Sequence, residues 1–216
     1  MHLIASNEWR RHDIPEEVGS GPVRGHGRAL GQSLEDTRLD AGMIDADRAD
    51  VPSMLRVDQA GEYGATRIYA GQLAVLGDRQ PASRMIARMA LQEQRHLTEF
   101  DRIMIERGVR PTILQPFWNV AGHALGAVTA LIGPDAAMAC TAAVETEIDK
   151  HYEEQRRILG DDEPELGATI AEFQAEEVEH RDLALQHGAE NTFGYPILSA
   201  LIRAGCRAAI ALSKRI

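Results

Sequence analysis

The stretch Glu177-Val178-Glu179-His180 places a carboxylate and an imidazole three residues apart. Residues at this spacing lie on the same face of an α-helix, so one helical turn would supply two metal ligands. The same spacing occurs 84 residues earlier, in Glu93-Gln94-Arg95-His96. Another glutamate precedes each copy by 31 or 32 residues, and these two are Glu62 and Glu145. Six candidate metal ligands therefore come from four segments.

An internal repeat connects the four segments. A shift of 83 residues aligns Glu62 with Glu145 and Tyr69 with Tyr152, and a shift of 84 aligns the two Glu-x-x-His pairs. Such a repeat indicates two related αα-hairpins, which residues 108–133 would join by a long crossover. Antiparallel hairpins that face each other would bring the six ligands together at the centre of a bundle.

The helices can be placed from their end signals and from the spacing of apolar residues. Each of four long amphipathic segments begins at or next to a proline, and three of them end at a glycine, as helices often do. We expect these helices over residues 53–76, 81–107, 135–159 and 163–190. Two further helices, over 117–132 and 196–213, are mostly apolar.

The ligand types indicate which metal the site would hold. Glu93 and His96 lie within an apolar stripe, where a charged carboxylate is costly unless it is paired or bound to a cation. Mixed carboxylate and imidazole ligands suit iron or manganese better than a structural zinc site, which favours thiolates. Two helices with one glutamate each and two with Glu-x-x-His are typical of ferritin-like di-iron and di-manganese proteins. We therefore expect an all-α, ferritin-like four-helix bundle of two αα-hairpins with a long crossover, plus two apolar helices.

Other polar residues near the candidate ligands receive separate expectations. Five flanking acids fall off the inward face and should be exposed to solvent: Glu147, Glu153, Glu154, Glu176 and Glu179. His123 is expected to be a core or interface histidine. His151 and Tyr152 follow Glu145 by about two turns and are candidates for side chains that support the ligands, with ordinary packing as the alternative.

Composition and charge limit the class of protein. The chain has 216 residues and a formal net charge of −10, which leaves no basic stripe for nucleic acid. Its two cysteines are 66 residues apart, so we expect neither a disulfide framework nor a Cys-x-x-Cys site, and a reducing compartment is indicated. We expect no secretory signal, because Met1–Ile4 is the only apolar start, and no stretch offers the roughly 18 uninterrupted apolar residues of a membrane span. Residues 1–50, rich in glycine and charge, should form a mobile arm before a domain over 51–216.

Several motifs resemble one known family. Leu55-Arg56-Val57-Asp58-Gln59-Ala60-Gly61-Glu62-Tyr63-Gly64-Ala65 looks like the opening motif of the demethoxyubiquinone hydroxylase family of ubiquinone biosynthesis. Further matches are Trp118-Asn119-Val120, Glu176-Glu177-Val178-Glu179-His180 and Ala204-Gly205-Cys206-Arg207. The similarity covers about residues 53–216 and leaves the first 50 outside it.

The resemblance implies a di-iron monooxygenase that uses O2 to hydroxylate the ring of a polyprenyl methoxy-benzoquinol. It implies two bound iron ions, held by Glu62, Glu93, His96, Glu145, Glu177 and His180. The two electrons that the reaction needs would come from outside the chain, from NADH or a quinol, because no flavin or nicotinamide fingerprint is visible. Other ubiquinone-biosynthesis proteins are candidate partners. The alternatives are a ferritin-like iron-oxidising or peroxide-reducing protein and a non-catalytic quinone-binding subunit.

A polyprenyl substrate would reside in the bilayer, so the resemblance also predicts binding to a membrane surface. The apolar helices 117–132 and 196–213 could lie in the interface, with Lys214 and Arg215 near anionic headgroups. We therefore expect a peripheral membrane protein, on the cytoplasmic face of the inner membrane if the source is bacterial. The alternative is that both helices simply cover the bundle.

Overall fold

The computed structural model describes residues 50–78 and 80–216. The arm expected over residues 1–50 lies outside this range except for Asp50, so the domain boundary stays a prediction. All regular structure in the described residues is helical, which confirms the all-α class. The elements are α2 (Val51–Leu76), α3 (Pro81–Arg107), α4 (Gln115–Ile132), α5 (Pro134–Leu159), α6 (Pro164–Gln186), the 3-10 turn η1 (Ala189–Asn191) and α7 (Tyr195–Ser213).

The helix ends follow the local chemistry of the sequence, with two differences. Helix α2 begins at Val51 and not at residue 53, and the side chain of Asp50 caps it by accepting a hydrogen bond from the Ser53 amide at 3.2 Å. The Ser53 hydroxyl donates to the carbonyl of Lys214 at 3.0 Å and ties the end of α7 to the start of α2. Helix α6 ends at Gln186 and not near 190, because Gly188 adopts a positive φ of 97° and η1 follows.

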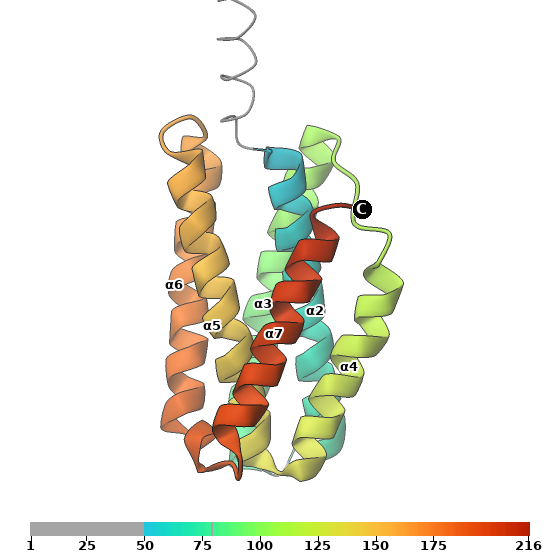
Figure 1. Ribbon diagram of the computed structural model, residues 1–216, viewed down its shortest axis with the longest axis vertical. Coiled ribbons are helices and arrows are strands. Elements are labelled where there is room, and N and C mark those ends of the chain that lie inside the picture. The colour runs from blue at the N-terminus through green and yellow to red at the C-terminus, as the bar shows by residue number, and fades with distance from the viewer. Residues whose placement is uncertain (1–49, 79) are drawn as a thin grey trace, which may run out of the picture. The chain divides into compact units, whose positions relative to one another are not determined.

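The helices pack as two groups that share a centre. Helix α2 packs against α3 and α4, and α5 packs against α6 and α7. Figure 1 shows α4 running beside α2 and α7 lying across the front of α5. Helix α4 therefore forms most of the connection between α3 and α5, a segment that lies outside the repeat.

Glycines bring α2 and α4 unusually close together. A Cβ atom added to Gly126 would lie 1.9 Å from the carbonyl oxygen of Ile68, and one added to Gly71 would lie 2.1 Å from that of His123. Both distances are far below van der Waals contact, so only glycine permits this backbone approach. The spacing of Gly122 and Gly126 places both on the face of α4 that meets α2.

Two apolar clusters fill the bundle on either side of its middle. One contains Leu55, Phe100 and Phe173, and the other contains Ile86 and Met138. On α2, α3, α5 and α6 the candidate ligands lie between the residues of these clusters. The six polar side chains are therefore enclosed by apolar packing at both ends.

We expect Gly126→Ala to destabilise the bundle, because the new methyl group would collide with the backbone of α2. The cost should be about 1–3 kcal/mol or more, as for other overpacked sites. Thermal denaturation followed by circular dichroism measures it, with a fall of about 2–4 °C in Tm per kcal/mol for a chain of this length. Gly64→Ala is the control, since its Cβ would have no neighbour within 4 Å. It should leave Tm unchanged or raise it slightly, and equal losses in both variants would contradict the close approach.

Candidate metal centre

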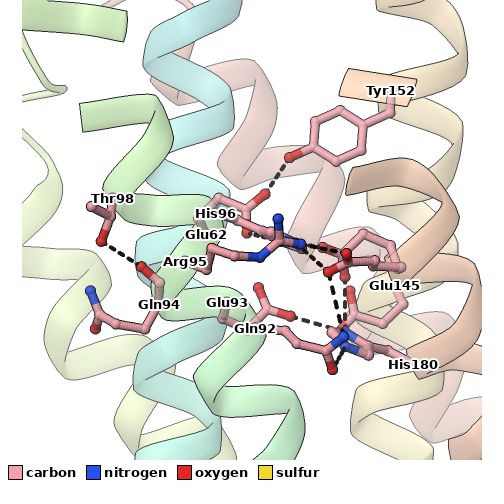
Figure 2. A network of polar contacts seen from close by, with 12 residues as sticks. Glu62, Gln92, Glu93, Gln94, Arg95, His96, Thr98, Glu145, Tyr152 and His180 are labelled. Atoms are coloured by element: carbon pink, nitrogen blue, oxygen red, sulfur yellow. Dashed lines mark hydrogen bonds and ion pairs between the residues drawn. The ribbon is translucent and has the colours of Figure 1, made fainter. Parts of the chain in front are cut away.

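Four helices each bring part of one buried polar cluster to the middle of the bundle. Helix α2 provides Glu62, α3 provides Glu93 and His96, and α5 provides Glu145. Helix α6 provides Glu177 and His180. Each of the six side chains is at most 1% exposed. The structure thus brings together all six residues that the spacing predicted, and Figure 2 shows five of them by label.

Both histidines direct Nδ1 toward the carboxylates. Nδ1 of His96 lies 2.9 Å from Oε1 of Glu177 and 3.3 Å from Oε2 of Glu62. Nδ1 of His180 lies 3.1 Å from Oε1 of Glu93 and 3.2 Å from Oε2 of Glu177. These two nitrogens are therefore the imidazole atoms placed to bind a metal.

The cluster divides into two positions for a cation. One is surrounded by Glu62, Glu93, His96 and Glu177, and the other by Glu93, Glu145, Glu177 and His180. In each group one ligand atom per residue lies within 4.8 Å of the others. Glu93 and Glu177 belong to both groups, so these are the carboxylates that can bridge two ions, a detail that the sequence pattern left open.

The donor set fits a metal because several of its buried oxygens have no partner outside the cluster. Oε2 of Glu62, Oε1 of Glu93 and Oε1 of Glu177 face only the Nδ1 atom of a histidine. Oε2 of Glu93 and Oε2 of Glu145 accept no hydrogen bond. A buried acceptor without a donor costs about 1–3 kcal/mol, and more when it is charged. Bound cations at the two positions would satisfy these oxygens and neutralise the carboxylates.

The raised pKa values of two carboxylates show that their ionised forms are unfavourable without a nearby positive charge. Burial raises the pKa of Glu93 and of Glu145 well above the ordinary value, and the charge of Glu177 raises both further. Burial lowers the pKa of His96, but hydrogen bonds to Glu177 and Glu62 outweigh it and bring that pKa to about 10. In the metal-free protein a second proton on His96 therefore occupies the place of a metal ion.

The outer nitrogen of each histidine is held from the opposite helix. Nε2 of His96 donates to Oε2 of Glu176 at 2.9 Å, and Nε2 of His180 donates to Oε1 of Gln92 at 3.0 Å. Both bonds leave Nδ1 free for a metal. The expectation that Glu176 is an exposed flanking acid is wrong, because its side chain is 23% exposed and also pairs with Arg95. Gln92 and Glu176 each precede a Glu-x-x-His pair, so the repeat itself could have identified them.

Two buried tyrosines hold the remaining glutamates in the same crossed manner. The hydroxyl of Tyr152 donates to Glu62, and that of Tyr69 donates to Glu145 at 2.8 Å. Burial raises the pKa of both tyrosines well above the ordinary value, and the nearby carboxylates add to this, so both remain donors. The sequence interpretation included Tyr152 and missed Tyr69, although the shift of 83 aligns the two residues.

The other polar residues have mixed outcomes. Nε2 of His151 faces Oδ1 of the buried Asp58 at 3.4 Å and does not contact a candidate ligand. Glu147 was expected to be exposed, but it is buried and accepts a 2.7 Å hydrogen bond from Arg203 on α7. His123 is exposed and not part of the core of this chain. The flanking acids exposed as predicted are Glu153, Glu154 and Glu179.

A helical bundle with four buried glutamates and two buried histidines at its centre defines the class of ferritin-like carboxylate proteins with a dinuclear metal site. Comparison with known proteins identifies the family. The family model for the ubiquinone biosynthesis protein COQ7 matches residues 49–213. The chain belongs to this COQ7 family, which confirms the resemblance seen in its motifs.

Named relatives agree with this assignment. The chain is 50% identical over 188 residues to a 3-demethoxyubiquinol 3-hydroxylase from Rhodospirillum rubrum, covering 87% of this chain and 88% of the relative. It is 53% identical over 172 residues to the mitochondrial NADPH-dependent 3-demethoxyubiquinone 3-hydroxylase of Mus musculus, covering 78% and 79%. The human protein of the same name is 51% identical over 173 residues, with the same coverage.

We expect the free energy of unfolding of the metal-free chain to fall as the pH rises above 6.5, the ordinary pKa of a histidine. The pKa of His96 is raised from 6.5 to about 10 in the folded state, so its protonation stabilises the fold fully below 6.5. This contribution is lost progressively between 6.5 and about 10. The raised pKa values of Glu93 and Glu145 act in the same direction, because their ionisation also disfavours the fold.

Thermal unfolding of the metal-free and metal-loaded chain across this pH range measures the effect. Metal ligands bind in their deprotonated form, so the loaded chain should vary less and the gain from metal should grow with pH. A gain that shrinks as the pH rises would contradict protonated ligands in the metal-free state.

Proposed function

We propose that this chain is an O2-dependent monooxygenase that hydroxylates the ring of a polyprenyl demethoxy-benzoquinol in ubiquinone biosynthesis. The observation that carries the proposal is the buried cluster of four glutamates and two histidines with unpaired oxygens. It lies in a chain about half identical to proteins named demethoxyubiquinol or demethoxyubiquinone hydroxylases. These names favour the hydroxylase over the iron-oxidising or peroxide-reducing protein and over the non-catalytic quinone-binding subunit.

The proposed cofactor is a pair of iron ions. One ion would be held by Glu62 and His96 and the other by Glu145 and His180, with Glu93 and Glu177 shared between them. Carboxylate and imidazole ligands suit iron, and iron supplies the one-electron steps that allow O2 to react with an organic substrate. The metal type is supported by the donor set and by the family.

The proposed reaction requires electrons and protons from outside the substrate, ligands held in place and a site that excludes water. One atom of O2 enters the ring and the other leaves as water, so each turnover consumes two electrons and two protons. The tyrosine hydroxyls of Tyr69 and Tyr152 hold Glu145 and Glu62 in place by donating to one oxygen of each. The apolar clusters on both sides of the site exclude water, which would otherwise compete at the reacting atoms.

The electrons are proposed to come from a nicotinamide cofactor. The mammalian relatives are named as NADPH-dependent, so NADPH takes the place of NADH in the sequence-based hypothesis. Rates of ring hydroxylation with NADPH, with NADH and with a reduced quinol compare the three sources directly.

Ligand substitutions test the site. We expect Glu177→Ala and His96→Ala each to abolish ring hydroxylation and to reduce iron from about two ions per chain. Loss of a side chain that only supports a ligand already costs about 10–100-fold, so loss of a ligand should exceed that. Iron analysis and mass spectrometry of the quinone product measure both effects. Glu179→Ala on the same helix is the control, since Glu179 is exposed and should be dispensable. Full activity in both ligand variants would refute the proposal.

We also propose that the chain binds a membrane surface through α4 and α7, on the inner membrane in a bacterium. Both helices carry exposed apolar side chains, and these include Phe117, Val120, Leu131, Ile197 and Leu201. Among the described helices, α7 is long and apolar enough to cross a membrane by length and composition, with a mean hydropathy of 1.3. Only 17% of its most apolar window is buried, so most of that surface is available to lipid. The mitochondrial relatives and a polyprenyl substrate support the same location.

Two matched leucines test the membrane surface. We expect the chain to float with liposomes that contain anionic lipid, and Leu201→Glu on α7 to reduce the floating fraction, because a charge in the interface opposes insertion. Leu91→Glu on α3 is the control, since Leu91 is 74% exposed and Leu201 is 67% exposed. If both variants floated equally, the proposal that α7 contacts the membrane would be contradicted.

A further inference from the structure

The two halves of the metal centre follow one pattern but differ in the residue behind each histidine. The outer nitrogen of His96 faces the carboxylate of Glu176, whereas the outer nitrogen of His180 faces the amide of Gln92. Gln92 and Glu176 occupy equivalent places in the repeat, directly before each Glu-x-x-His pair. The repeat therefore places a charged acceptor behind one histidine and a neutral acceptor behind the other.

The two outer residues are joined to each other as well. Nε2 of Gln92 donates to Oε2 of Glu176 at 3.4 Å, while Oε1 of Gln92 accepts from His180 at 3.0 Å. The two contacts together fix the orientation of the amide, with its oxygen toward His180. A continuous path of hydrogen bonds thus runs from His180 through Gln92 and Glu176 to His96.

Further contacts hold the carboxylate behind His96 in place. Arg95 binds the other oxygen of Glu176 and also donates to Glu172 at 2.9 Å, which leaves Oε2 of Glu176 directed at His96. The ring of Phe173 stacks on His96 with a centroid distance of 4.0 Å. Figure 2 shows Arg95 and His96 together at this edge of the cluster.

The difference between amide and carboxylate changes the ligand strength of the imidazole. A hydrogen bond to a charged acceptor is roughly twice as strong as one between neutral groups. It draws the Nε2 proton away from the ring and makes Nδ1 a better donor to a metal. A neutral amide has this effect to a smaller extent, so His96 should be the stronger of the two histidine ligands.

We infer that Glu176 and Gln92 make the two metal positions unequal, so that the position at His96 and Glu62 fills first and holds its ion more tightly than the position at His180 and Glu145. Glu176 and Gln92 are positioning residues, since they act through the histidines. The inference rests on the proposed ligand set and adds an order of filling to it. A first ion fixed in this way would organise the shared Glu93 and Glu177 for the second.

Titration of the metal-free full-length chain with cobalt(II) alone tests the inference without any turnover. Calorimetry and cobalt absorption should give two separate dissociation constants. Glu176→Gln should weaken the first by about 10–100-fold, the usual effect of removing a partner of a metal-bound histidine. Gln92→Ala should weaken the second constant and should affect the first less than Glu176→Gln does, because Gln92 reaches His96 only through Glu176. Glu179→Gln is the control, because it removes one negative charge from an exposed residue on the same helix as Glu176, and both constants should match the wild type.

A second measurement uses the wild-type chain and does not depend on the folding of a variant. As cobalt(II) is added up to one equivalent, the NMR signal of the Nε2 proton of His96 should shift. The corresponding signal of His180 should shift mainly during addition of the second equivalent. The reverse order would overturn the inference, as would a first constant that Gln92→Ala weakens as much as Glu176→Gln does. A wild-type chain that binds no cobalt would instead refute the proposed ligand set itself.

Discussion

The structure depends on the burial of four carboxylates in the middle of a helical bundle. Desolvation and mutual repulsion make Glu93 and Glu145 resist ionisation, while Glu177 stays charged because His96 and His180 both contact it. The apolar clusters above and below allow little water to compensate. Cations at the two positions would neutralise these carboxylates, and without metal the raised pKa of His96 keeps a second proton on its ring beside Glu177 and Glu62.

The helices outside the four-helix core serve that centre indirectly. Helix α4 approaches α2 through Gly71 and Gly126, so the helix that carries Glu62 is held from its outer side by backbone contact. Helix α7 is held against α5 by Glu147, which accepts from Arg203. Both helices keep much of their apolar surface exposed, and this surface is proposed to meet the membrane that carries the quinol.

The hydrogen bonds around the site repeat the symmetry of the chain. Tyr69 and Tyr152 each cross between α2 and α5 to hold a glutamate, and Gln92 and Glu176 each cross between α3 and α6 to hold a histidine. These residues correspond in the repeat, but the pair behind the histidines differs in charge, since Gln92 is an amide and Glu176 a carboxylate. A repeat that began as two similar hairpins can in this way give two metal positions with different properties.

The sequence by itself determined the helices, the class of fold and the six candidate ligands. Helical spacing and an internal repeat are properties of the order of residues along the chain and do not depend on tertiary contacts. It also carried the family motifs. Only the tertiary structure decided which glutamates are shared, since Glu93 and Glu177 become common to both positions once four helices converge. It also decided the partners of Glu147 and Glu176, which face the solvent side of their own helices but are covered by α7 and α3. The residues that contact these acids lie far away in the chain, so the spacing of a single helix could not reveal them.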